Sequence, residues 1–156
     1  MSKRHVLYYL GAFLINLAII SIILAYAGLV PFGSNNFLSS DLGTQYLAFL
    51  TELRRQLISG NFHLYLFSQS LGDNFFPVIS YYLLSPFNLL LVFFSSKGIP
   101  AAANIIIMLK ISTMGVMMAY FLKEYFHKVS PINYLFTVAY SFCGFVASYF
   151  YDLMWL

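Results

Sequence analysis

The sequence of 156 residues has very few charged side chains, since Asp, Glu, Lys and Arg make up only 8% of it. A soluble domain of ordinary composition has about 25%. Hydrophobic residues make up 61% of the chain, and its mean hydropathy is +0.80. This composition excludes a soluble globular domain and indicates a membrane protein in which continuous apolar runs form helices. We therefore predict an all-α membrane protein.

The sequence also lacks the residues that several common functions require. Cys143 is the single cysteine, so no disulfide can form within the chain. There is no P-loop, no dinucleotide-binding glycine pattern, no Gly-x-Ser-x-Gly motif and no His/Cys cluster with metal-ligand spacing. We expect neither a metal nor a cofactor. The eight basic residues occur singly or in pairs and form no stripe, which argues against nucleic acid as a partner.

Three apolar stretches are long enough to cross a bilayer, which takes about 20 residues in a helix: residues 6–30, 99–122 and 129–151. Aromatic side chains near the ends of the first and third stretches are typical of membrane interfaces. The pair Lys3-Arg4 before the first stretch resembles the start of a signal peptide. The stretch itself is too long for the apolar part of one, about 7–15 residues, so we expect a retained span.

An external loop, residues 31–77, follows the first span. Apolar side chains at helical spacing predict an amphipathic helix at 42–59 that lies on the outer membrane face. Asp41 can cap the start of this helix and Gly60 can end it. Residues 78–96 are apolar but interrupted by prolines and an asparagine. A stretch of this kind is interfacial or re-entrant, or else a short span.

The positions of the basic residues help to choose between these alternatives. If residues 78–96 do not cross the membrane, Lys3, Arg4, Lys123 and Lys128 all lie on the cytoplasmic side, as the positive-inside rule requires. If they do cross, Lys123 and Lys128 lie outside. We favour the first arrangement, which has three spans and a cytoplasmic N-terminus.

Lys110 lies in the middle of the span at residues 99–122. A charge there costs at least about 2.5–3.5 kcal/mol on insertion scales. An intramembrane cation usually faces a bundle interior or a wet cavity and has an anionic partner, which makes Lys110 a candidate binding residue. The alternative is a lysine that snorkels to the interface.

Three aspartates fall on the outer side in the favoured arrangement. Asp41 can act as a general base toward a hydroxyl group or serve only as a helix cap. Asp152 follows the third span, where a lone acid is commonly a solvated helix end. Asp73 lies in a Leu-Gly-Asp-Asn turn and, with His63 in the same loop, is a secondary candidate.

Two neighbouring arginines, Arg54 and Arg55, lie on the predicted amphipathic helix. The guanidinium fork suits a phosphate group because it can make two parallel hydrogen bonds. The plainer explanation is attraction of an interfacial helix to anionic lipid.

The order of motifs resembles the bacterial YfhO-type membrane proteins. Asp-Leu-Gly-Thr-Gln-Tyr at 41–46 follows one span, and Leu-Gly-Asp-Asn-Phe stands at 71–75. The most specific block is Ser-Tyr-Tyr-Leu-Leu-Ser-Pro-Phe-Asn-Leu-Leu at 80–90. A span with Leu109-Lys110 and the sequence Tyr-Asp-Leu-Met-Trp-Leu at 151–156 complete the resemblance, which covers nearly the whole chain.

This resemblance implies a function at the outer face of the bacterial cytoplasmic membrane. Proteins of that family look like GT-C superfamily glycosyltransferases, which take a sugar from a polyprenyl-phosphate carrier. They are associated with the glycosylation of cell-envelope polymers such as lipoteichoic acid. They are also much longer, so we expect this chain to be an N-terminal portion that works with the rest of a full-length protein.

The family's acidic residues fall in the first external loop and often in the next one, which by position are Asp41 and Asp152. We expect these two to be catalytic, and Lys110, Arg54 and Arg55 to bind the carrier phosphate. The expected partners are membrane lipids, the polyprenyl-phosphate sugar and the envelope polymer that accepts it. Two alternatives stay open: a lipid or solute transporter or flippase segment, and a non-catalytic membrane assembly module.

Overall fold

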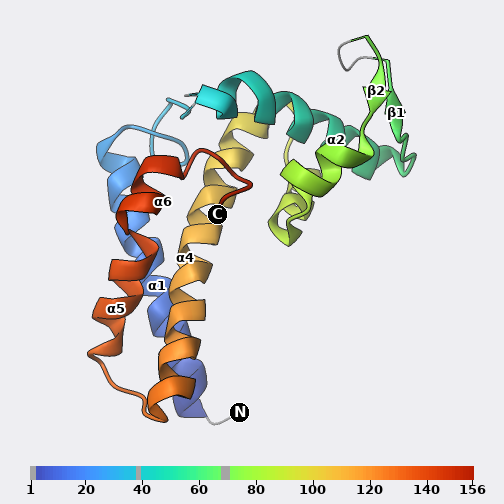
Figure 1. Ribbon diagram of the computed structural model, residues 1–156. Helices are drawn as coiled ribbons and strands as arrows, with labels where there is room; N and C mark the ends of the chain where they lie inside the picture. The colour runs from blue at the N-terminus through green and yellow to red at the C-terminus, as the bar shows by residue number, and fades with distance from the viewer. Residues whose placement is uncertain (1–2, 38–39, 68–70) are drawn as a thin grey trace. The chain divides into compact units, whose positions relative to one another are not determined.

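A computed structural model describes residues 3–37, 40–67 and 71–156 (Figure 1). The external loop expected at 31–77 includes residues 38–39 and 68–70, which lie outside the described residues. Most of the described chain is helical. Its only strands are the two-residue β1 (Tyr65–Leu66) and β2 (Asp73–Asn74). The prediction of an all-α membrane protein is confirmed.

Two helices are long and apolar enough to cross a membrane. The first is α1 (Lys3–Tyr26) and the second runs over Ser96–Phe126, most of which is α4 (Ile99–Phe126). A third crossing is counted only if the bent pair Phe76–Leu83 and Pro86–Phe93 is treated as one span.

The chain divides into two compact units, which we describe separately. Unit 1 contains α1, α4 from Ile107 onward, α5 (Asn133–Ser141) and α6 (Gly144–Tyr149). Unit 2 contains the residues from Asn36 to Ile106 together with Tyr151–Trp155.

In unit 1, α1 and α4 pack in antiparallel directions. The Tyr8 hydroxyl donates a hydrogen bond of 3.3 Å to the Ala119 carbonyl, whereas Asn16, two turns later in α1, lies against Gly115, one turn earlier in α4. As the residue number increases along α1, the residue number of its contact in α4 decreases, so the two helices run in opposite directions. The first turn of α1 and the last turn of α4 consequently lie at the same end of this unit (Figure 1).

A buried asparagine joins α1 to α5. The Asn16 side chain is fully buried, and its Nδ2 donates to the Ala12 carbonyl at 2.8 Å and to Thr137 Oγ1 at 3.4 Å. Polar contacts and close packing at small residues hold membrane helices together. The hydrophobic effect does not drive helices to associate there, because lipid tails are as apolar as the helix surfaces. Gly115 supplies the small residue here, because a Cβ at this position would collide with the Asn16 amide.

The third apolar stretch, expected to be continuous at 129–151, is two helices in the structure. Phe142 and Cys143 separate α5 from α6, and Cys143 is extended with φ −65° and ψ 164°. Gly144 follows the break, and glycine disfavours a helix interior by about 1 kcal/mol relative to alanine. Sequence hydropathy has no means of detecting such a break, because both halves are apolar.

In unit 2, the amphipathic helix begins as a π-helical segment, η1 (Leu42–Tyr46), and continues as α2 (Leu47–Ser59). Gly60 ends it in the left-handed region with φ 68°, and its N–H donates to the Gln56 carbonyl. Asp41 precedes the helix as predicted, but its side chain makes no capping hydrogen bond, so the prediction of a side-chain cap is wrong.

The apolar segment after the β-hairpin is sharply bent. It consists of α3 (Phe76–Val78), the π-helical η2 (Ile79–Leu83) and the 3₁₀-helical η3 (Pro86–Phe93), with a bend of 102° between η2 and η3. Ser85 is extended because the following proline disfavours helical backbone before it. The Leu83 carbonyl accepts two hydrogen bonds at the bend, one from the Ser85 N–H at 2.8 Å and one from the Asn88 amide at 2.9 Å. A short helix, η4 (Ser96–Gly98), leads into α4.

We expect Gly115→Ala to destabilise unit 1 by about 1–3 kcal/mol, the usual effect of an added group in a packed interior. The matched control is Gly144→Ala, whose Cβ would meet nothing within 4 Å. Thermal unfolding of the purified variants in detergent measures the difference. Equal unfolding midpoints for the two variants would contradict the packing of α1 on α4 described above.

Candidate functional site

Both predicted catalytic residues, Asp41 and Asp152, belong to unit 2. Asp41 is half-buried immediately before η1, and Asp152 is buried with 6% of its surface exposed. The Asp152 Oδ1 atom accepts no hydrogen bond within the described residues. Burial, and then the charge of Asp41, raise the pKa of the Asp152 carboxyl above its ordinary value. The negative charge of Asp41 therefore acts on the Asp152 carboxyl.

The π-helical turn aligns Asp41 with a buried tyrosine. Hydrogen bonds from i to i+5 widen the turn, so the fifth residue along comes back toward the first. Tyr46 is fully buried, and burial raises the pKa of its hydroxyl to about 12. The phenol consequently stays protonated at neutral pH and beside the two carboxyl groups can only donate or accept hydrogen bonds.

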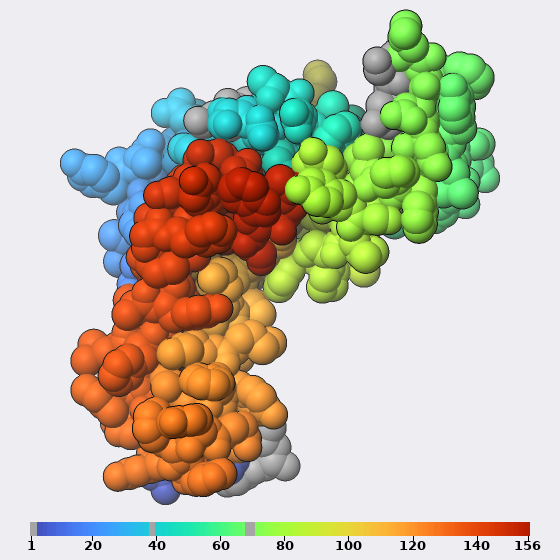
Figure 2. Space-filling view, viewed as in Figure 1, coloured from blue at the N-terminus to red at the C-terminus, as the bar shows by residue number. Residues whose placement is uncertain are grey.

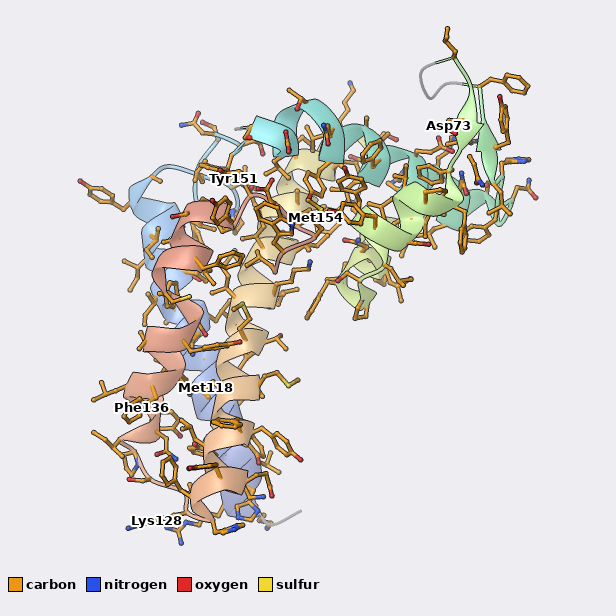
Figure 3. All side chains as sticks on the ribbon, in the orientation of Figure 1. Asp73, Met118, Lys128, Phe136, Tyr151 and Met154 are labelled. Atoms are coloured by element: carbon orange, nitrogen blue, oxygen red, sulfur yellow. The ribbon has the colours of Figure 1, made fainter. Side chains whose placement is uncertain are left out.

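Tyr46 also holds the segment that carries Asp152. Its hydroxyl accepts a hydrogen bond of 3.4 Å from the Met154 N–H, two residues after Asp152. Tyr151, on the other side of Asp152, packs at a tilt against Phe37 with ring centroids 6.1 Å apart. Figure 3 labels Tyr151 and Met154 on this segment. Asp152 is thus fixed from both sides within unit 2.

Sequence reasoning missed the role of Tyr46, which it counted only as part of an apolar helix face. The ring of Tyr46 packs edge-on against Tyr82 at 5.5 Å, and Tyr82 also contacts Phe49. A five-residue spacing from Asp41 was the available signal. This spacing brings two residues to the same side of a helix only in a π turn, and the residue pattern of an α-helix does not reveal a π turn.

Lys110 lies in the part of α4 that belongs to unit 1, and its side chain is buried with 8% of its surface exposed. A snorkelling lysine would extend its ammonium group toward the interface and stay exposed. The burial argues against a snorkelling lysine, and a binding role for Lys110 stays a prediction.

Both arginines of α2 have protein partners. Arg54 donates from Nε to the Phe94 carbonyl at 2.5 Å and from Nη1 to Ser96 Oγ at 3.2 Å, which ties α2 to the end of η3. Arg55 makes a two-pronged contact with Glu52 at 2.8 and 2.6 Å and lowers the pKa of that carboxyl. A phosphate role for either arginine stays a prediction.

The secondary candidates lie apart from the carboxylate pair along the chain. Asp73 is exposed on β2, where its Oδ1 accepts from the Asn74 N–H at 2.6 Å, and Figure 3 labels it on the hairpin. Gly72 makes this turn possible, since its φ of 100° is strained for other residues. The His63 side chain is exposed, and its carbonyl accepts a hydrogen bond from Gln56.

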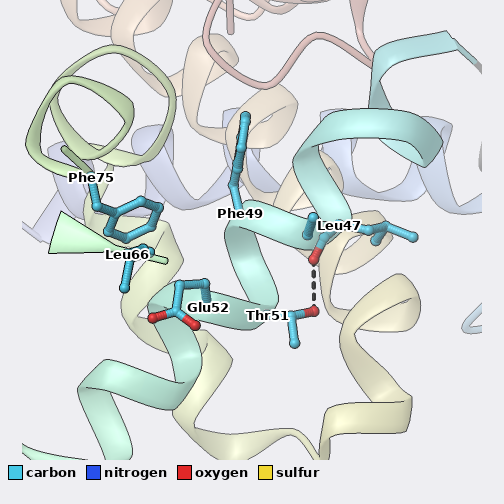
Figure 4. Close-up of a pocket in the computed structure, with 7 residues that line it drawn as sticks. Leu47, Phe49, Thr51, Glu52, Leu66 and Phe75 are labelled. Carbon is cyan, nitrogen blue, oxygen red and sulfur yellow. Dashed lines mark hydrogen bonds between the residues drawn. The ribbon is translucent and has the colours of Figure 1, made fainter. Parts of the chain in front are cut away.

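Two pockets flank α2 in unit 2. One, of about 410 Å³, is lined by residues of α2 with Leu66 and Phe75 (Figure 4). Its polar groups have protein partners, because Thr51 donates to the Leu47 carbonyl and Glu52 binds Arg55. The other pocket, of about 300 Å³, lies between α2, η2 and η3 and is almost entirely apolar. Its lining suits a hydrocarbon chain better than a polar substrate.

A match to a known family covers most of the chain. The model of a family described as bacterial membrane protein YfhO matches residues 12–156. The chain belongs to the YfhO family. The matched range includes both carboxylates, Lys110 and the two arginines. A search of curated proteins and a search of solved structures gave no match. Among the described residues of this YfhO-family chain, no group of three His, Cys, Asp or Glu side chains could hold a metal ion.

The raised pKa of Asp152 predicts a dependence of stability on pH. The folded state holds the proton of this carboxyl more tightly than the unfolded chain does. The free energy of unfolding therefore falls as the pH rises from the unfolded to the folded pKa, and the loss persists at higher pH. Asp152→Asn cannot ionise and avoids this loss. We expect it to unfold at a higher temperature than the unmodified chain at neutral pH, and at a similar one in acid.

The control for this prediction is Asp73→Asn, because Asp73 is exposed and lies on the hairpin. Its unfolding temperature should follow that of the unmodified chain at both pH values. A lower stability of Asp152→Asn at neutral pH would mean that the ionised carboxylate has a stabilising partner.

Proposed function

We propose that this chain is part of a membrane glycosyltransferase that takes a sugar from a polyprenyl-phosphate carrier and transfers it to a cell-envelope polymer such as lipoteichoic acid. The observation that carries the proposal is the pair Asp41 and Asp152, with Asp152 buried and one of its oxygens without a hydrogen bond in the described chain. A buried carboxyl group of this kind costs stability, and such groups are concentrated at functional sites.

The carboxylate pair provides a general base. In the transfer, an acceptor hydroxyl loses its proton to a carboxylate while its oxygen forms a bond to the anomeric carbon of the sugar. The bond from that carbon to the phosphate oxygen breaks, and the electron pair leaves with the polyprenyl phosphate. Asp152 suits the base role better than Asp41, which the sequence alone suggested, because a raised pKa makes a carboxylate a stronger base. Asp41 then binds and orients the acceptor hydroxyl.

The carrier requires a site for its phosphate and one for its isoprenoid chain. The buried ammonium group of Lys110 is the proposed phosphate ligand, since a cation stabilises the charge that develops on the leaving group. The apolar pocket between α2, η2 and η3 is suited to isoprenoid units. Arg54 and Arg55 would have to leave their present hydrogen-bond partners in order to bind the carrier phosphate.

The antiparallel packing in unit 1 supports the proposed topology. Because the start of α1 and the end of α4 lie at one end of the unit, the segment between them returns to the face where α1 ended. With Lys3, Arg4, Lys123 and Lys128 at the opposite face, the positive-inside rule gives a cytoplasmic N-terminus.

We expect Asp152→Asn and Asp41→Asn, made in the full-length protein, each to lower sugar incorporation into envelope polymer. For Asp152→Asn the loss should be at least about 100-fold, the lower end of what a positioned general base contributes. Incorporation of labelled sugar in cells with matched amounts of protein measures the effect. Asp73→Asn is the control and should keep its activity. Normal incorporation with Asp152→Asn would remove the carboxylate pair from the mechanism.

A transporter or flippase is the second candidate, because the 102° bend resembles the broken helices that line transporter binding sites. Lys110→Met separates the two functions. A transferase with this change loses glycosyl product, whereas a flippase loses movement of labelled lipid across proteoliposomes and makes no product before or after the change. A non-catalytic assembly module predicts that neither readout responds to changes at Lys110 or the aspartates.

A further inference from the structure

A third pocket, of about 400 Å³, lies in unit 1 at the end where α1 begins and α4 ends. Five of the six residues that line it are basic or imidazole side chains: Arg4, His5, Lys123, His127 and Lys128, with Val129 completing the wall. Figure 3 labels Lys128 in the turn after α4, and Figure 2 shows the surface of this turn in orange. The carboxylate site described above does not use this pocket.

The pocket is assembled from positions more than a hundred residues apart, and the packing next to it holds its walls in place. Tyr8 donates to the Ala119 carbonyl and accepts a hydrogen bond of 2.9 Å from the Asn133 amide. Tyr8, Ala12 and Ala119 form a buried cluster against which Val129 packs. The first turn of α1, the last turn of α4 and the start of the following turn are therefore fixed relative to one another.

The charges in this pocket are unbalanced. Arg4, Lys123 and Lys128 are cations, and the carboxylate in direct contact with them among the described residues is Glu124, whose Oε1 accepts from Lys123 Nζ at 2.6 Å. Like charges brought together in one concave site repel one another unless an anion joins them. A phosphate group supplies that anion, since its oxygens accept several charge-assisted hydrogen bonds at once.

The surroundings of the pocket indicate that the phosphate belongs to a lipid. On the last two turns of α4, Tyr120, Phe121, Tyr125 and Phe126 are each more than half exposed. Exposed aromatic rings at the end of an apolar helix are typical of the headgroup level of a membrane. A lipid bound here would place its phosphate among the cations and its acyl chains along this aromatic surface. A free phosphate ester would use only the first of these two features.

We propose that this pocket is a binding site for the headgroup of an anionic phospholipid. The site takes a net negative phosphodiester and discriminates against zwitterionic lipids, because a choline cation would meet Arg4 and the lysines. Basic pockets between membrane helices bind anionic headgroups in this way at cytoplasmic surfaces. The lipid then joins α1 to the end of α4 and stabilises the packing of unit 1.

The test is thermal unfolding of the purified full chain in a neutral detergent with added probes. Dioleoyl-phosphatidylglycerol should raise the unfolding temperature in a saturable manner, since a ligand that binds only the folded state stabilises it. Dioleoyl-phosphatidylcholine, which has the same acyl chains, and glycerol 3-phosphate, which has none, should not do so at the same concentrations. An equal shift with phosphatidylcholine would overturn the proposal, and an equal shift with glycerol 3-phosphate would overturn the lipid as the ligand.

A matched pair of variants tests the position of the charges. Arg4→Gln with Lys128→Gln should weaken the apparent affinity for phosphatidylglycerol by at least about tenfold, because hydrogen bonds to charged groups contribute that much. Lys3→Gln removes an exposed charge that does not line the pocket, and it should leave the affinity unchanged. An equal loss in both would mean that overall basic charge attracts the lipid. If the double variant does not fold, the comparison of the three probes on the unmodified chain decides.

Discussion

The structure depends on how an apolar chain satisfies the few polar groups that it buries. In hydrocarbon, water cannot replace a missing hydrogen bond, so each buried polar side chain needs a partner within the protein. Asn16 donates to Ala12 and Thr137, Tyr8 binds Ala119 and Asn133, and Asn88 donates to the Leu83 carbonyl at the bend before Pro86. These contacts fix the antiparallel packing of α1 on α4 and the shape of the bent segment.

Asp152 connects the fold to the proposed function. Five buried side chains retain an oxygen without a hydrogen-bond partner in the described part of the chain, and Asp152 is the ionisable one among them. The hydroxyl of Tyr46 accepts from the Met154 N–H and so holds the segment that carries Asp152. A fold that buries a carboxyl group without an anion-stabilising partner raises its basicity, which suits a general base. Membership of the YfhO family places this arrangement in a bacterial membrane protein.

Much of the fold could be predicted from the sequence, because hydropathy and helical periodicity report directly on spans and amphipathic faces. The helix at 42–59 and its end at Gly60 follow from such patterns. The break at Phe142 and Cys143 does not, since both halves of that stretch are apolar. The candidate site was predictable only in part. Asp41 and Asp152 stand out as rare acids in an apolar chain, but their mutual influence depends on contacts between distant segments, and the role of Tyr46 depends on a π turn. The partners of Arg54 lie forty and more residues away, where no local pattern reveals them.

The central claim is that burial and the charge of Asp41 together raise the pKa of the Asp152 carboxyl. Infrared titration of the purified chain measures this directly, because a protonated carboxylic acid has a carbonyl band that the carboxylate lacks. The account predicts a band that is absent from Asp152→Asn and that, in Asp41→Asn, disappears at a lower pH than in the unmodified chain. A band that titrates at the same pH with and without Asp41 would contradict it.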